Sequence, residues 1–123
     1  MKLLVCGGRE FSDFKRLTAR MNLIHAMEEV RCVIHGGARG ADTLAGQWAR
    51  DHGVQEVVCA ANWDYHGKKA GPIRNKAMLL LAPDCAMVLP GGVGTKNMLT
   101  LLQAYGRATI FDYTDGVPDV EII

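Results

Sequence analysis

The chain has no paired cysteines, no long apolar run and no excess of charge of one sign. Its four cysteines, Cys6, Cys32, Cys59 and Cys85, form no CxxC pair. We therefore expect no metal site and interpret them as thiols in a reducing cytosol, mostly buried. The longest apolar run, from Ala77 to Pro83, is far too short to span a membrane. These absences predict a cytoplasmic protein with no membrane partner.

Charge is almost balanced, with 14 basic and 13 acidic residues and a net charge of +1. A broad polyanion-binding surface needs a clear excess of positive charge. We therefore do not expect nucleic acid as a partner. A small anionic ligand stays open, because several basic residues lie in or beside the glycine-rich turns described below.

Two familiar phosphate-binding motifs are also missing. A P-loop would read GxxxxGK[ST], but His66-Gly67-Lys68 has Asn62 where the first glycine belongs, and Lys69 replaces Ser or Thr. A dinucleotide fingerprint would read GxGxxG, but Gly92-Val93-Gly94 is followed by Thr95-Lys96-Asn97. The sequence thus supports neither a P-loop kinase nor an ordinary NAD dehydrogenase, and we expect no cofactor.

The sequence does contain a regular alternation of strand and helix patterns. Short apolar runs predict strands near residues 2–6, 31–35, 55–59, 84–89 and 108–112, and a final strand is suggested at 120–123. Helical spacing between them is shown by Leu17, Met21 and Ile24, and later by Ile73, Ala77 and Leu81. The 123 residues suit one domain, 1–123. We predict an α/β fold with a doubly wound parallel sheet in the order 3-2-1-4-5 and helices on both faces.

Three glycine-rich turns each follow an apolar strand and precede a helix. Their order matches a cradle for phosphate, in which glycines let backbone N–H groups converge at a helix start. The alternative is that they only allow tight turns. In a doubly wound sheet all three lie at the carboxyl edge, where ligands bind. The candidate binding residues in these turns are Gly7, Gly8, Arg9, Gly36, Gly37, Ala38, Gly40, Gly91, Gly92, Gly94 and Thr95.

Other residues accompany the turns. Asp42 either caps the following helix or accepts a ribose hydroxyl, and both readings stay open. Arg74 and Asn75, beside Gly71-Pro72, are further candidate binding residues, and Arg74 suits a phosphate contact better than a surface ion pair. Trp63 either stacks on a base or covers the edge of the core. Lys68-Lys69 is interpreted as a solvated face.

Four motifs in order resemble the SLOG superfamily, which is named for the SMF/DprA and LOG proteins. They are GGREF (7–11), HGGARGAD (35–42), AGPIRNKAM (70–78) and PGGVGT (90–95). The resemblance is strongest to the YspA-type small stand-alone domains. It implies a Rossmann-like fold that binds nucleotides or nucleotide-derived ligands. In the superfamily, LOG enzymes hydrolyse nucleoside 5'-monophosphates to base and ribose 5-phosphate, and DprA binds single-stranded DNA.

The sequence departs from LOG enzymes at catalytic positions. LOG enzymes carry two glutamates shortly after PGGxGT, where this chain has Asn97 and Met98, and a lysine where it has Asn75. An amide cannot act as a general base near neutral pH. We therefore expect a nucleotide-binding or sensing module, with a hydrolase that uses Asp42 or Asp64 as the alternative. The resemblance also implies a homodimer through the helices that flank the pocket.

Overall fold

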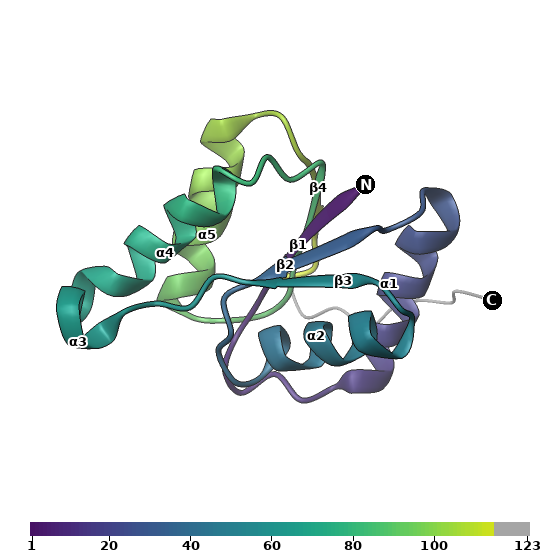
Figure 1. Cartoon of the computed structure of the whole chain (residues 1–123), viewed down its shortest axis with the longest axis horizontal. Helices are drawn as coiled ribbons and strands as arrows, with labels where there is room; N and C mark the ends of the chain where they lie inside the picture. Colours follow the sequence, from purple (N-terminus) through teal and green to yellow (C-terminus); the bar gives the residue numbers. More distant parts are fainter. Residues whose placement is uncertain (115–123) are drawn as a thin grey trace.

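The computed structural model describes residues 1–114, in which five strands form one sheet (Figure 1). Each strand is a short run of mainly apolar residues, and the central ones are buried on both faces. All five predicted strands are confirmed to within one residue at each end, and the strand suggested at 120–123 lies outside the described residues. The strands are β1 (Lys2–Cys6), β2 (Cys32–His35), β3 (Gln55–Val58), β4 (Cys85–Val88) and β5 (Thr109–Asp112).

The strands are all parallel and pair in the order β3-β2-β1-β4-β5. Leu4 in the central strand lies opposite Ile34 of β2 on one side and Ala86 of β4 on the other. This confirms the predicted Rossmann-like, doubly wound sheet. The chain leaves β1 first to one side and later to the other, so a crevice forms beyond the carboxyl ends of β1 and β4.

Helices cover both faces of the sheet, as predicted (Figure 1). On one face, α1 (Phe14–Met27) and α2 (Ala41–Asp51) pack on Leu3 and Val5. On the other face, α4 (Ala70–Leu79) and α5 (Val93–Tyr105) pack on Leu4 and Cys6. Successive residues of β1 thus serve opposite layers, as the alternation of side chains along a strand requires.

The structure corrects the sequence analysis on α4. The helix exists, but its buried residues are Ala70, Gly71, Asn75 and Met78, whereas Ile73 and Ala77 of the predicted stripe are exposed. A short helix, α3 (Trp63–His66), and a 3-10 turn, η1 (Gly67–Lys69), precede α4 and were not predicted. The buried face of α4 is the one that borders the cavity described next, and so it is not uniformly apolar.

Within residues 1–114, none of the helices combines the length and the apolar character that crossing a membrane requires. The four cysteines are free; Cys6, Cys32 and Cys85 are buried and Cys59 is partly buried.

Candidate functional site

The three glycine turns meet at the peptide groups of Gly8. The Gly8 N–H donates to the Pro90 carbonyl at 2.8 Å, and the Gly8 carbonyl accepts from the Ala41 N–H at 3.2 Å. One turn is therefore hydrogen-bonded to the residues beside the other two. This fixes the mouth of the crevice at the carboxyl edge, where the turns were predicted to gather.

Two of the predicted binding glycines hold the turns together and do not line a cavity. Gly40 has φ +81°, and a side chain there would collide with the backbone of Gly8 and Arg9. A side chain on Gly91 would meet the Thr95 hydroxyl and, at 2.7 Å, the Gly8 nitrogen. Both positions need glycine because two backbone segments approach each other closely.

A cavity of about 460 Å³ lies among the turns, which we call the main cavity. That volume suits a ligand of nucleotide size. The predicted residues that line it are Gly7, Gly8, Arg9, Ala38, Asp42, Arg74, Asn75, Gly92, Gly94 and Thr95. Residues not assigned to the site from sequence complete its wall, namely Cys6, Trp63, Lys68, Gly71, Pro72, Met78, Val93 and Asn97.

The N-terminus of α5 opens into the main cavity. Gly92 precedes the helix, has no side chain to cap it, and lines the cavity with Val93, Gly94 and Thr95. The first N–H groups of a helix have no partner within it, and the helix dipole places partial positive charge there. This wall is thus suited to an anion, with the cationic side chains of Lys68 and Arg74 on the same cavity.

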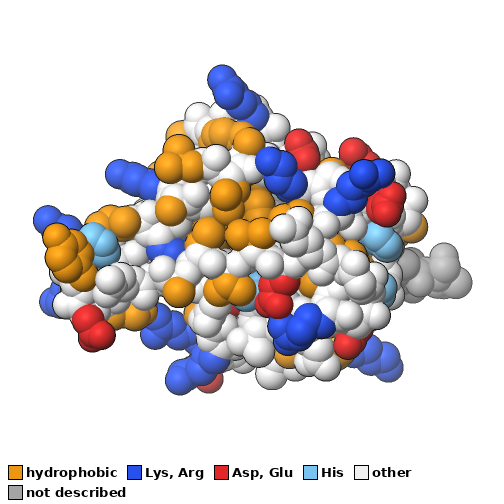
Figure 2. All heavy atoms as spheres, viewed as in Figure 1, with side chains coloured by type: hydrophobic (Ala, Val, Ile, Leu, Met, Phe, Trp, Pro, Cys, Tyr) orange, Lys and Arg blue, Asp and Glu red, His pale blue; other side chains and the backbone are white. Residues whose placement is uncertain are grey.

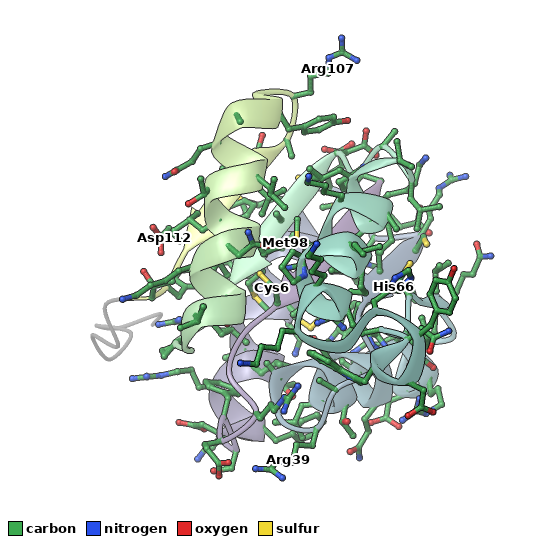
Figure 3. All side chains as sticks on the ribbon, turned by 90° about the vertical axis from the view of Figure 1, so that its left-hand side faces the viewer. Cys6, Arg39, His66, Met98, Arg107 and Asp112 are labelled. Atoms are coloured by element: carbon green, nitrogen blue, oxygen red, sulfur yellow. The ribbon has the colours of Figure 1, made fainter. Side chains whose placement is uncertain are left out.

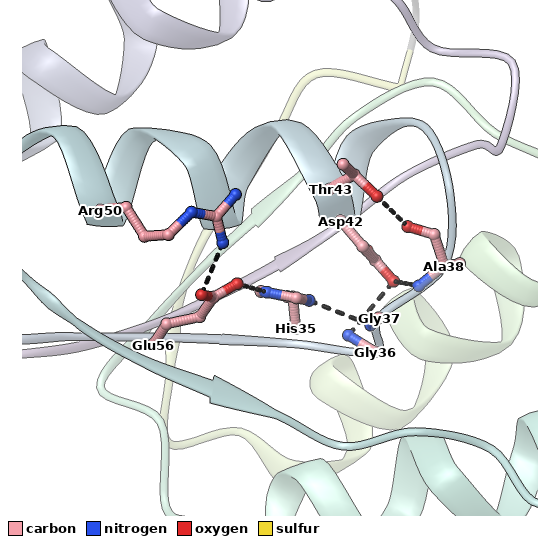
Figure 4. A network of polar contacts seen from close by, with 8 residues as sticks. All are labelled: His35, Gly36, Gly37, Ala38, Asp42, Thr43, Arg50 and Glu56. Atoms are coloured by element: carbon pink, nitrogen blue, oxygen red, sulfur yellow. Dashed lines mark hydrogen bonds and ion pairs between the residues drawn. The ribbon is translucent and has the colours of Figure 1, made fainter.

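The amides of the Gly36 turn, in contrast, are already engaged inside the protein. The N–H groups of Gly36 and Ala38 donate to Asp42 Oδ2, at 3.1 and 3.2 Å, and the Gly37 N–H donates to His35 Nδ1 at 3.0 Å (Figure 4). A phosphate on these amides would have to displace Asp42 and His35. The turn therefore presents its carboxylate, rather than its amides, to a ligand.

Asp42 is buried, and both of its turn contacts end on one carboxylate oxygen. Burial raises the pKa of Asp42 above its usual value, although the two N–H donors, His35 and Arg74 act in the opposite direction. The same side chain lines the main cavity. Asp42 thus organises the turn through one carboxylate oxygen and also borders the main cavity.

Arg74 and two asparagines form a chain of hydrogen bonds along the main cavity. Arg74 donates from Nη1 to the Gly36 carbonyl at 2.8 Å and from Nε to Asn75 Oδ1 at 2.9 Å. Asn75 donates to Asn97 Oδ1 at 2.9 Å and to the Gly94 carbonyl at 3.2 Å. A side chain on Gly36 would collide with the Arg74 guanidinium. Among residues 1–114, no carboxylate pairs with Arg74.

Cys6 lines the main cavity but is not a nucleophile. It lies in the interior with Met98 (Figure 3), and burial, with a contribution from the Asp42 charge, raises its pKa to about 12. Only a thiolate attacks efficiently, and this thiol stays protonated near neutral pH. The structural interpretation of Cys6 therefore stands.

Trp63 separates the main cavity from a second cavity of about 370 Å³ and lines both. Trp63 is 49% exposed, and the Arg9 guanidinium lies 5.5 Å from the centre of its ring. Tyr65, which also follows the third strand, is exposed and lies against His66. Of these two aromatic residues, only Trp63 is placed to stack on a ligand.

A polar network behind the Gly36 turn was not found from sequence. His35 accepts from Gly37 through Nδ1, so its Nε2 carries the proton and donates to Glu56 Oε2 at 2.6 Å. Arg50 donates to the other Glu56 oxygen at 2.7 Å (Figure 4). His35 and Glu56 lie on neighbouring strands and are 21 residues apart, and no motif links them.

Together, the parallel sheet and the turns at its carboxyl edge define a Rossmann-like α/β fold. Within that fold class the chain belongs to the YspA, cpYpsA-related SLOG family, whose model matches residues 1–66. This confirms the resemblance to the YspA-type branch, and two of the four motifs, at 7–11 and 35–42, lie within the matched residues.

One relative is the Gene 61 protein of Mycobacterium phage D29. It is 35% identical over 117 residues, which cover 89% of this chain and 94% of the phage protein.

Two solved structures share the fold. DNA processing protein A (DprA) from Streptococcus pneumoniae superposes with a TM-score of 0.70 at 17% identity, over 90% of this chain and 49% of DprA. The protein TM1055 gives a TM-score of 0.66 at 19% identity, over 86% of this chain and 70% of TM1055. This chain thus spans about half of the length of DprA, and the likeness concerns the fold alone.

Proposed function

We propose that this protein binds a nucleotide or a nucleotide-derived ligand in the main cavity and does not turn it over. The observation that carries the proposal is the placement of the uncapped N-terminus of α5 and the Asp42 carboxylate on one cavity. The first suits a phosphate and the second a sugar hydroxyl. Trp63, Pro72 and Met78 supply apolar wall for a base.

Binding of AMP, GMP, CMP and UMP, measured by calorimetry beside the free nucleosides, tests the phosphate assignment. Arg74→Ala should weaken nucleotide binding by more than about 1 kcal/mol, because it removes a charged donor from the cavity. Lys68→Gln should weaken it by about 0.5–1 kcal/mol. Lys69→Gln is the matched control, because Lys69 does not line the main cavity. Equal affinity for nucleosides and nucleotides would contradict the assignment.

The absence of turnover is argued from the carboxylates. In the described part of the chain, Asp42 is the only acidic residue that lines the main cavity, and Asp64 does not reach it. Asn97, at the position of a LOG glutamate, is hydrogen-bonded to Asn75, at the position of a LOG lysine. The Asn75–Asn97 pair is neutral. It keeps a hydrogen bond between these two positions but supplies no general base beside the sugar.

Free base released from the four monophosphates, measured by chromatography, should stay near the uncatalysed level. General acid–base assistance is worth about 10²–10⁴-fold, and that factor is missing here. Asn97→Glu combined with Asn75→Lys should raise the release, whereas Asn97→Gln should not. Robust turnover by the natural chain, lost in Asp42→Asn, would instead establish the alternative, a hydrolase that works through Asp42.

The name of DNA processing protein A raises DNA as a second ligand for this fold. The net charge of +1 argues against a DNA-binding surface here. We propose a small-molecule ligand, and we expect no salt-dependent retention of single-stranded DNA.

A further inference from the structure

We infer that the ligand carries two phosphate groups at separate places on the molecule, one for the main cavity and one for the second cavity. This inference rests on the proposed function and deepens it. It excludes the simplest ligand, a nucleotide whose phosphates all extend from one carbon of the sugar. The argument comes from the composition of the second cavity and from the wall that the two cavities share.

The second cavity is a cationic hollow. Arg9, Arg39 and Arg74 line it, and no acidic residue within the described chain does so. Glu10 pairs with Arg39 at 2.5 Å, but that pair is largely exposed to solvent. Arg39 lies at the rim of the molecule (Figure 3), while Arg74 reaches the inner wall. Three arginines on one hollow favour an anion there, although Glu10 offsets part of the charge of Arg39.

The amides of the Gly36 turn do not provide this anion site. Gly36, Gly37 and Ala38 line the second cavity, yet their N–H groups donate inward to Asp42 and His35. The charged donors that remain for an anion in the second cavity are therefore the arginine side chains. Arg74 has donors to spare: a guanidinium has five N–H groups, and its contacts with Gly36 and Asn75 use two of them.

The two cavities adjoin. Arg9, Ala38, Trp63 and Arg74 line both of them. Trp63 offers an aromatic ring on which a base could stack where the two cavities adjoin. A nucleoside bisphosphate, with phosphates on two carbons of one sugar, fits this layout. A dinucleotide, with phosphates on two sugars, has the same chemistry.

Calorimetry with four probes separates these ligands: AMP, ADP, adenosine 3',5'-bisphosphate and the dinucleotide pApA, with the guanosine series in parallel. At least one of the two compounds with separated phosphates should bind about tenfold or more tightly than AMP. ADP has a second phosphate on the same carbon as the first, and it should gain much less. The tighter of the bisphosphate and the dinucleotide identifies the source. An equal gain for ADP would overturn the inference, because total charge alone would then explain it.

Ala60 allows a matched pair of variants, because it is exposed and lines only the second cavity. Ala60→Glu places a carboxylate beside the arginines, and Ala60→Gln places a neutral group of the same size there. Ala60→Glu should abolish the gain from the second phosphate, measured against AMP on the same variant, while Ala60→Gln keeps the gain. If AMP binds and Ala60→Glu leaves the gain intact, the inference is wrong and the proposed function stands. If no nucleotide binds, both are wrong.

Discussion

Asp42 is the residue on which the Gly36 turn depends, because two turn amides donate to the same carboxylate oxygen. Asp42→Ala should lower the free energy of unfolding by about 1–3 kcal/mol, since it leaves buried N–H groups without an acceptor. Asp42→Asn keeps an acceptor oxygen at that place and should therefore avoid this loss. Urea unfolding of both variants measures the difference.

The same residue predicts a pH dependence. The pKa of Asp42 is raised in the folded state, mainly by burial. The unfolded chain therefore loses this proton at lower pH than the folded chain. The contribution of the protonated Asp42 carboxyl to the free energy of unfolding is complete below the unfolded pKa of 3.8. It is lost as pH rises through the higher folded pKa. Asp42→Asn should flatten this slope between pH 4 and neutrality, and an unchanged slope would contradict the assignment.

Between β2 and β3, stability depends on the contact of His35 with Glu56. His35 is 3% exposed and donates to Glu56, whose outer oxygen accepts from the exposed Arg50. Glu56→Ala leaves a buried ring N–H unpaired and should cost about 1–3 kcal/mol of unfolding free energy. Arg50→Ala removes only an exposed partner and should cost about 1 kcal/mol or less.

The pKa of Glu56 is lowered, first by the His35 hydrogen bond and then by Arg50. Its contribution is therefore present above its ordinary value of 4.5 and is lost as pH falls through the lower folded pKa. The stability gap between the natural chain and Glu56→Ala should shrink in that acidic range. A gap that is constant with pH would show that packing, and not the charge, carries the effect.

Among the secondary-structure elements, the strands were predicted correctly because buried parallel strands appear in the sequence as apolar runs. The evenly sized crossovers between them then indicate the strand order. The prediction of the buried face of α4 was wrong, because Asn75 is buried there through hydrogen bonds to Gly94 and Asn97. Hydrophobic spacing does not detect a buried polar residue. Helix α3 has four residues, with Asn62 accepting from the Tyr65 N–H, and so it is too short for a periodic pattern.

The sequence predicted many of the residues at the site, but not which of their groups face a ligand. Glycine turns at the carboxyl edge identify where a ligand binds. Which amides face the ligand depends on backbone directions, and only the structure shows that those of Gly36 and Gly37 point to Asp42 and His35. Lys68, interpreted as a solvated residue, is exposed and also borders the main cavity, because the unpredicted α3 and η1 carry the chain around it.

On the scale of the whole molecule, α4 leaves apolar side chains uncovered. Ile73, Ala77 and Leu80 follow one another at helical spacing on its exposed side, and Leu80 is 86% exposed. Figure 2 shows further hydrophobic side chains between α4 and β3 on the face viewed. The predicted homodimer would cover such a stripe, because a twofold axis lets the same helix face pack on itself.

We propose that this stripe, Ile73, Ala77 and Leu80, is the contact between two copies, and light scattering at tens of micromolar should then give twice the monomer mass of 13.4 kDa. Leu80→Lys places a charge in the contact and should shift the protein to the monomer. Lysine at a helix C-terminus complements the dipole, so the fold should not suffer. Met27→Lys is the matched control: Met27 is also an exposed apolar residue at a helix end, but on α1, which covers the opposite face of the sheet. A natural chain that is monomeric would show that no such dimer forms. A dimer that survives Leu80→Lys but dissociates with Met27→Lys would show that the contact lies on α1.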